Sequence, residues 1–378
     1  MTGHNAYTPN KIANDHLRSY TTSNLNIFER PPSYSSCSSP IRYEIRKGLL
    51  AGKYVGRVVV FLRGAGCEWM KTGGGCTMCG FHLATNAGVK INDEAQFEQV
   101  EKALNETRKY HFPILCLYND GSFLNANEIS RGVVAKILNL INKSTWIKKL
   151  VVESRPEYIT DESLLFVKNH LSIDFKIAVG LETTSDQIRY NCLNKGFSLE
   201  DFKRAFMTIL SYGYQIKPLL LVKPPFLTER EAIDDCVNSI GQLKDMGVPA
   251  VDLEIMTIQE GTLVYKLWQK GLYATPSLWS VLEIISKSPS DYPVYISPIQ
   301  YSVDQFFQMA NCRVCFEAIS NKIINSYNVN LNRQELLVLV NRFDCFCRHN
   351  WQEKLKEHDD RPLKLRSTEM IKILKGKR

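Results

Sequence analysis

The chain contains 378 residues, of which 44% are hydrophobic and 23% are charged, and its formal net charge is +8. This composition excludes disordered and fibrous proteins, because the apolar fraction is large enough to form a core. No apolar run approaches the length of a membrane span, and the polar N-terminal segment lacks the apolar stretch of a secretion signal. We therefore expect a cytoplasmic protein that does not bind or cross a membrane.

Residues 1–56 are polar and are interrupted by Pro31, Pro32 and a serine-rich stretch, which predicts an irregular lead-in. From residue 57 onward, a short apolar run followed by a helical pattern forms a unit that occurs six times before about residue 275. The six strands are expected at residues 57–62, 114–119, 149–154, 175–183, 216–222 and 251–257.

Six successive strand-helix units predict an α/β fold with a parallel sheet, which is either open and doubly wound or closed into a complete or partial barrel. In all of these folds the ligand site lies beyond the carboxyl ends of the strands. We therefore expect the polar segments that follow the strands to line one mouth. These segments are residues 63–79, 119–123, 153–156, 182–185, 223–225 and 254–257.

The alternation fades after residue 275, although residues 292–296 are typical of one more strand and residues 333–343 of a packed helix. We predict a small C-terminal module over residues 276–360, followed by a basic tail over residues 361–378. The tail has seven basic residues and one acidic residue, a net charge of +6, which leaves only +2 for the rest of the chain. Such a tail either contacts phosphates or is a solvated terminus.

Seven of the eleven cysteines fall into two groups, which are Cys67, Cys76, Cys79 and Cys312, Cys315, Cys345, Cys347. The cytoplasm keeps thiols reduced, so metal binding is the first hypothesis for both groups. In the second group, a CxxC and a CxC clip can build a tetrahedral zinc site that stabilises the small module. A second iron-sulfur cluster and metal-free thiols are the alternatives.

The first group lies in the segment RGAGCEWMKTGGGCTMCGF, directly after the first predicted strand. Its glycines permit backbone conformations that other residues resist, so the three thiolates can fold around a compact inorganic core. A structural zinc ion would need a fourth ligand. A cluster held by three thiolates instead has one iron open to substrate or cofactor.

This segment resembles the cluster loop of radical S-adenosylmethionine enzymes, in which three cysteines follow the first strand of a barrel and end in CxxC. The eight residues between Cys67 and Cys76 exceed the common spacing of that superfamily. In this respect the segment is similar to the subgroup of the elongator catalytic subunit, and most closely to the radical subunit of archaeosine synthase. Met78 stands where an aromatic residue is usual.

Three further segments carry the resemblance. YNDGSF after the second strand is similar to the turn that binds the amino group of the cofactor methionine, which implies a contact with Asn119, Gly121, Ser122 and Phe123. ESRPEYI resembles the ExRP segment of the elongator subgroup. GLETTSD, which is followed by NKGF, also resembles the corresponding segment of that subgroup. The cofactor-binding residues that these two segments imply are Glu153, Arg155, Glu182 and Arg189.

The chemistry of these side chains suits the cofactor. A carboxylate such as Glu153 or Glu182 can accept hydrogen bonds from an ammonium group or from ribose hydroxyls, and the forked donors of Arg155 or Arg189 suit a carboxylate. The alternative for each residue is a structural ion pair at the barrel rim.

The resemblance implies a partial (β/α)6 barrel of the TIM type over residues 57–275, with a 4Fe-4S cluster, S-adenosylmethionine and an electron donor. Cleavage of the cofactor would give a 5′-deoxyadenosyl radical that abstracts hydrogen from a nucleoside, such as a 7-deazaguanine in tRNA, and a partner subunit is a further expectation. One alternative is a radical S-adenosylmethionine enzyme acting on a free metabolite or biosynthetic intermediate, which the low charge outside the tail favours. Another is a non-catalytic metal-binding scaffold subunit.

Overall fold

The computed structural model describes residues 15–24, 37–81, 85, 89–298, 305–306 and 310–376. Its main sheet has the strand order β1-β2-β3-β4-β5-β6-β7-β9. The strands are β1 (Arg42–Leu50), β2 (Lys53–Phe61), β3 (Ile114–Tyr118), β4 (Lys149–Glu153), β5 (Asp174–Glu182), β6 (Gln215–Val222), β7 (Val251–Ile255) and β9 (Val294–Ile296). All six predicted strands are present, and the extra strand expected at residues 292–296 is β9, which lies parallel to β7.

The six predicted helices are also present, as α4 (Asp93–Thr107), α5 (Arg131–Lys143), α6 (Asp161–His170), α8 (Leu199–Ser211), α9 (Glu229–Asp245) and α10 (Leu263–Gln269). Local sequence fixes where they begin. The side chains of Ser198 before α8 and Thr228 before α9 each accept a hydrogen bond from the backbone N–H of the residue three positions later. The side chain of that later residue accepts a hydrogen bond from the backbone N–H of Ser198 or Thr228 in return. The alternation of strands and helices confirms the predicted α/β fold of a partial barrel.

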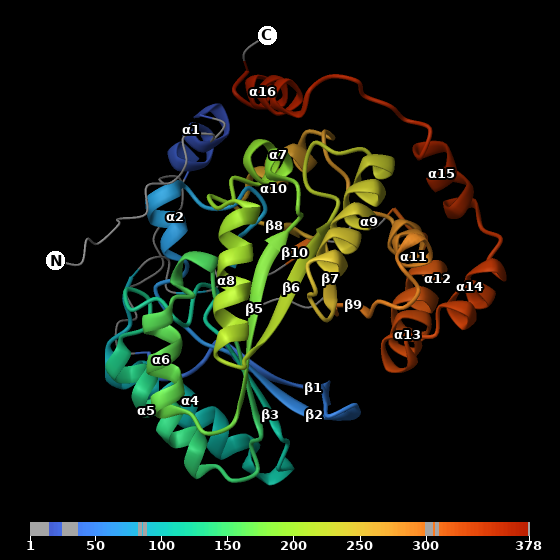
Figure 1. The fold of residues 1–378 in the computed structure, drawn as a ribbon. Helices are drawn as coiled ribbons and strands as arrows, with labels where there is room; N and C mark the ends of the chain where they lie inside the picture. The colour runs from blue at the N-terminus through green and yellow to red at the C-terminus, as the bar shows by residue number, and fades with distance from the viewer. Residues whose placement is uncertain are drawn as a thin grey trace. The chain divides into compact units, whose positions relative to one another are not determined.

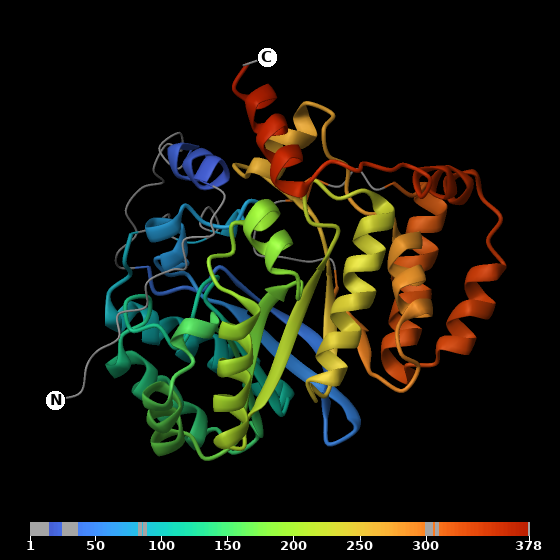
Figure 2. The ribbon, with the colours of Figure 1, turned by 45° about the horizontal axis from the view of Figure 1, so that its top comes forward.

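The chain forms two compact units, and the first comprises residues 1–76, 84–179 and 189–216. Strand β2 pairs in parallel with β3, β3 with β4, and β4 with β5. Helices α4, α5, α6 and α8 lie on one face of these strands (Figures 1 and 2). Residues 114–117 of β3 are fully buried, as expected for a parallel strand that is covered on both faces.

The irregular lead-in expected over residues 1–56 is wrong for residues 42–56, which belong to an antiparallel hairpin. Strand β1 pairs along its whole length with β2, and Ala51 and Gly52 form the turn with φ angles of 46° and 76°. Three hydrophobic residues of β1 are exposed, since Tyr43, Ile45 and Leu49 are 37%, 44% and 40% exposed. The strand therefore lacks the buried apolar alternation from which it could be predicted.

The second unit comprises residues 77–83, 180–188 and 217–378. Helix α9 packs against α11 (Leu278–Lys287), and α11 packs against α14 (Arg333–Asn341), which is the packed helix expected at residues 333–343. The region predicted as a separate module, 276–360, thus shares a compact unit with β6 and β7. It also contains α12 (Arg313–Ala318), α13 (Asn325–Asn330) and α15 (Phe346–Lys354). Among the described residues, no helix is both long and apolar enough to cross a membrane.

Part of the basic tail is helical, since α16 runs from Leu363 to Leu374. Arg366 is 5% exposed and donates hydrogen bonds to both carboxylate oxygens of Glu231 in α9, at 2.7 and 2.8 Å. Burial alone would raise the pKa of Glu231, but the hydrogen bonds from Arg366 hold it below its ordinary value. Arg361 pairs with Asp359. Two of the tail's bases are therefore engaged within the protein.

We expect Arg366→Ala to destabilise the protein by about 2 to 3 kcal/mol, because it removes a two-pronged ion pair and leaves Glu231 without its partner. Thermal unfolding measures the change. Lys372→Ala is the matched control, since Lys372 is exposed on the same helix and its loss should change stability by no more than about 0.5 kcal/mol. Equal melting temperatures for the two variants would contradict the assigned role of Arg366.

Candidate functional site

The carboxyl ends of three strands carry non-glycine residues in the left-handed backbone region. Asp120 after β3 has a φ of 52°, Glu182 at the end of β5 a φ of 67°, and Lys223 after β6 a φ of 65°. Each such conformation costs about 1 to 3 kcal/mol and is retained mainly at functional sites. Backbone strain thus marks the same strand ends that the sequence assigns to ligand binding.

The short helix α2 (Glu68–Gly73) begins directly after Cys67, the first member of the first cysteine group. Cys67 and Cys76 belong to the first unit, and Cys79 belongs to the segment 77–83 of the second. Burial raises the pKa of the Cys67 thiol to about 12, Arg155 opposes this rise, and the neighbouring Cys76 adds to it. The soft thiol donors fit an iron-sulfur cluster, and the cation of Arg155 favours the thiolate form that such binding needs.

The turn after β3 is organised by Glu128, a residue that the sequence did not single out. One oxygen of Glu128 accepts hydrogen bonds from the backbone N–H of Ser122 at 2.5 Å and from the side chain of Asn119 at 3.1 Å. The other oxygen accepts from the backbone N–H of Glu68 at 2.9 Å. Burial raises the pKa of Glu128, and the two backbone donors oppose the rise. Glu128 thus ties the residue after Cys67 to the predicted cofactor turn.

The predicted cofactor residues of β3 and β4 come together in the first unit. The side chain of Glu153 accepts from the backbone N–H of Gly121 at 3.3 Å, and its carbonyl oxygen accepts from the N–H of Phe123 at 2.9 Å. The N–H of Arg155 donates to the hydroxyl of Ser122 at 3.1 Å. Burial, helped by the charge of Asp120, raises the pKa of Glu153 to about 8. A cationic ligand beside Glu153 would favour its ionised form.

Gly121 leaves no room for a side chain. A Cβ atom there would lie 2.0 Å from an oxygen of Glu128, so Gly121→Ala must displace either the turn or the Glu128 carboxylate that holds it. We expect this variant to weaken the binding of S-adenosylmethionine at least about tenfold, a loss of roughly 1.4 kcal/mol that calorimetric titration can measure. Gly64→Ala is the control, because its Cβ would meet only the side chain of Gln96, at 3.8 Å. Unchanged affinity in Gly121→Ala would remove this turn from the cofactor site.

The guanidinium group of Arg155 is already engaged within the protein. It donates to Glu157 at 2.5 Å and to the carbonyl oxygen of Lys195 at 2.9 Å. Burial would lower the pKa of Arg155, but Glu157 and then Cys67 keep it above its ordinary value. The ion pair that was the structural alternative for this residue is therefore present, next to the cysteine loop.

The other two predicted cofactor residues are buried. Arg189 is 0% exposed within the π-helical turn η4 (Arg189–Leu193), and its guanidinium group lies 6.0 Å from the centre of the Phe197 ring. Glu182 is 8% exposed at the end of β5 and belongs to the second unit.

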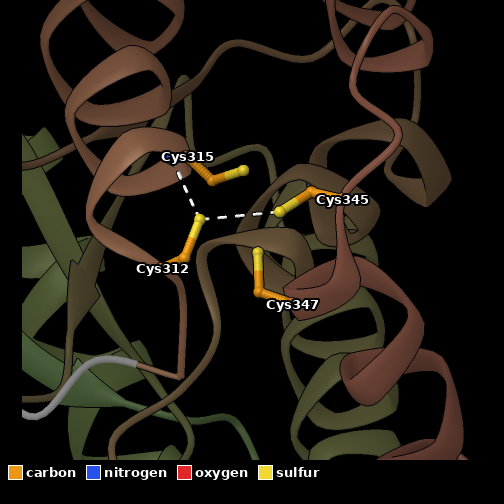
Figure 3. Close-up of side chains that lie close together, drawn as sticks. All are labelled: Cys312, Cys315, Cys345 and Cys347. Atoms are coloured by element: carbon orange, nitrogen blue, oxygen red, sulfur yellow. Dashed lines mark hydrogen bonds between the residues drawn. The ribbon is translucent and has the colours of Figure 1, made fainter.

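The second cysteine group forms a compact four-sulfur site in the second unit (Figure 3). The four sulfur atoms all lie within 4.8 Å of one another, and those of Cys312 and Cys345 are 3.5 Å apart. A tetrahedral ion with Zn–S bonds of about 2.3 Å holds its sulfurs roughly 3.8 Å apart. A four-iron cluster binds each thiolate to a different iron and spreads them further. The geometry therefore fits a single tetrahedral ion.

Two indole groups connect this site to helix α11. The N–H of Trp279 in α11 donates to the sulfur of Cys347 at 3.4 Å, and the N–H of Trp351 in α15 donates to the hydroxyl of Ser280 at 2.8 Å. A hydrogen bond from the backbone N–H of Cys315 lowers the pKa of the Cys312 thiol to about 7. Burial instead raises the pKa of the Cys315 thiol. Trp279 thus orients the sulfur of Cys347, and Cys312 is the thiol of this group whose thiolate form the backbone favours.

No family model matches the chain. The chain is 32% identical over 321 residues to "Archaeosine synthase subunit beta" of Methanosarcina acetivorans, which covers 82% of this chain and 88% of that protein. The protein of the same name from Thermococcus kodakarensis is 28% identical, over 80% of this chain and 93% of that one. Among solved structures, the archaeal Elp3 of Methanocaldococcus infernus aligns with a TM-score of 0.45 and 19% identity, covering 55% of this chain and 53% of that chain.

The first relative matches at more than 30% identity over most of both chains. The chain therefore belongs to the family of archaeosine synthase beta subunits.

Proposed function

We propose that the chain modifies a 7-deazaguanine nucleoside in tRNA by radical chemistry, as the beta subunit of an archaeosine synthase. The observation that carries this proposal is the similarity to a protein of that name across 88% of its length. The word "subunit" in the relative's name supports a partner subunit for this chain as well. The cluster of predicted cofactor residues around Glu128 supports the same function.

In this proposal Cys67, Cys76 and Cys79 would hold a 4Fe-4S cluster. When bound, the cluster and S-adenosylmethionine supply the radical, with an electron from an external donor. The chain's own residues would bind and orient the cofactor and the cluster. Glu153 would accept hydrogen bonds from the ammonium or ribose hydroxyls of the cofactor, and Arg155 would balance the negative charge of the thiolates.

The C-terminal site of Cys312, Cys315, Cys345 and Cys347 would hold one zinc ion. Its close sulfur atoms favour a single metal over a second cluster. The ion would stabilise the packing of α12 and α15 and would take no part in the radical reaction.

Anaerobic incubation of the reduced protein tests the function. The substrates are a tRNA that carries the 7-deazaguanine and the corresponding free nucleoside, and mass spectrometry measures 5′-deoxyadenosine and product. Product from the tRNA alone supports the proposal. Equal efficiency with the free nucleoside supports the second candidate below, and a cluster-loaded protein that never cleaves the cofactor would be a scaffold instead.

The charge distribution favours a second candidate, an enzyme that acts on a free metabolite. The chain outside the tail carries only +2, and two bases of the tail pair with acidic residues of the protein. A tRNA enzyme would be expected to present more positive charge, because phosphate contacts provide much of the affinity for nucleic acids.

The exposed tail lysines allow these candidates to be separated. If they contact tRNA, replacing Lys364, Lys372 and Lys375 by Ala should reduce the slope of log affinity against log salt concentration by up to about 2 to 3. Substitution is cleaner than deletion, which would also remove Arg366. Cofactor cleavage without substrate should be unaffected. An unchanged slope would show that the tail does not bind tRNA.

A further inference from the structure

The loop between Cys67 and Cys76 is held by a segment more than a hundred residues away in the sequence. The side-chain amide of Asn194 donates hydrogen bonds to the carbonyl oxygens of Gly75 at 2.6 Å and Gly73 at 2.9 Å. Gly75 directly precedes Cys76 in the chain. Asn194 is 4% exposed and has a left-handed backbone with a φ of 52°. One buried amide thus fixes the backbone on which Cys76 is mounted.

The same segment encloses Trp69, which lies in the loop two residues after Cys67. The indole N–H donates to the carbonyl oxygen of Asn194 at 2.7 Å. A Cβ atom placed on either Gly73 or Gly196 would come within 2.3 Å of the indole ring. Trp69 therefore lies tightly between these two glycines, and its ring fixes the distance between the cysteine loop and the segment 194–197.

Arg155 adds a charge to this arrangement. Its guanidinium group lies 5.0 Å from the ring centre of Trp69 and 5.3 Å from that of Phe197, and it also bonds to the carbonyl oxygen of Lys195. A cation over aromatic faces is stabilised by their negative potential. The loop, the segment 194–197 and the cation next to the thiols thus form one connected unit within the first compact unit of the chain.

We propose that Asn194 and Trp69 are positioning residues that set the place of Cys76 relative to Cys67 before the cluster is assembled. Eight residues separate these two cysteines, and a free loop of that length would lose conformational entropy when its thiolates bind one cluster. The hydrogen bonds from Asn194 and the enclosed indole order the loop in advance, so less entropy is lost on binding. This inference rests on the proposed assignment of the cysteines to a 4Fe-4S cluster.

The test compares Asn194→Ala with Asn142→Ala, a matched control. Asn142 also braces a loop of the first unit, since its side chain donates to the carbonyl oxygen of His170 at 2.8 Å and accepts from the N–H of Ser172 at 3.1 Å. Both variants lose side-chain hydrogen bonds to backbone groups, which are buried for Asn194 and part-buried or exposed for Asn142, so both should lower the melting temperature of the apoprotein. Only Asn194→Ala should release iron to a chelator about tenfold faster and retain less iron after reconstitution.

Trp69→Phe keeps the inference testable if Asn194→Ala does not fold, because it removes only the indole N–H and keeps most of the ring. It should also accelerate iron release, by less than Asn194→Ala. Iron release at the wild-type rate in these variants, or equal acceleration in Asn142→Ala, would overturn the positioning role. A wild-type protein that binds no iron at all would overturn the proposed function together with this inference.

Discussion

Cys67→Ala is expected to abolish cleavage of S-adenosylmethionine and to remove the brown colour of the anaerobically reconstituted protein. Cys76→Ala and Cys79→Ala should have the same effect, because three thiolates are the minimum for a cluster that leaves one iron open. Because the three thiolates hold one cluster, removal of any one of them should remove the cluster. The rate of cofactor cleavage should therefore fall roughly a thousandfold or more in each variant. Quantification of 5′-deoxyadenosine, visible absorption and iron analysis give the three readouts.

Cys37→Ala is the control for this series. Cys37 is a half-buried cysteine of the first unit whose carbonyl oxygen accepts a hydrogen bond from Gln99. That bond does not need the thiol, and the bond that the thiol itself donates, to the carbonyl oxygen of Ser39 at 3.6 Å, is exposed. The control should therefore retain colour and activity. If the three variants still cleaved the cofactor, the cluster assignment would be wrong.

Cys315→Ser is expected to lower the melting temperature by about 10 °C or more and to release zinc. Cys315 is 2% exposed, and its sulfur lies among three others that would repel one another as thiolates without a metal. The free energy of metal binding at such a site adds to the free energy of folding. Loss of one ligand therefore removes a large part of the stability that the metal provides. The iron content of the remaining folded protein should be unchanged.

Cys236→Ala separates metal loss from simple core damage. Cys236 is 1% exposed in α9 of the same unit and belongs to neither cysteine group, so its replacement should cost only the removed packing and leave zinc bound. Metal analysis of anaerobically purified wild-type protein is decisive. Zinc well below about one equivalent, with iron near eight, would replace the zinc assignment by a second cluster.

The six strand-helix units between residues 57 and 271 could be predicted because their apolar periodicity matches their burial. The five apolar residues expected on one face of the helix after the second strand, Val133, Val134, Ile137, Leu138 and Ile141, are all buried in α5. The same geometry explains the site. Parallel strands end at one edge of a sheet, so Gly121 and Glu153 meet although 32 positions separate them in the sequence.

The contacts that organise the site could not be predicted in the same way. Glu128 and Asn194 act through hydrogen bonds to backbone groups that lie 60 and 119 residues away, and no local pattern encodes such pairs. Arg366 was predicted only as part of a basic tail, because its partner Glu231 is 135 residues distant. Contacts between side chains that are distant in the sequence depend on three-dimensional packing, whereas secondary structure depends mainly on the local amino-acid sequence.

Helices α11 and α15 are joined by two reciprocal hydrogen bonds from indole N–H groups, and these bonds determine how substitutions in the two helices combine. Trp279 binds the sulfur of Cys347, and Trp351 binds the hydroxyl of Ser280, so each helix donates one bond and accepts the other. Residues that share one network are energetically coupled and their substitutions are not additive. We therefore expect the loss of unfolding free energy in a double variant, Trp279→Phe with Trp351→Phe, to differ from the sum of the losses in the two single variants. Trp279 and Trp351 would then form an epistatic pair.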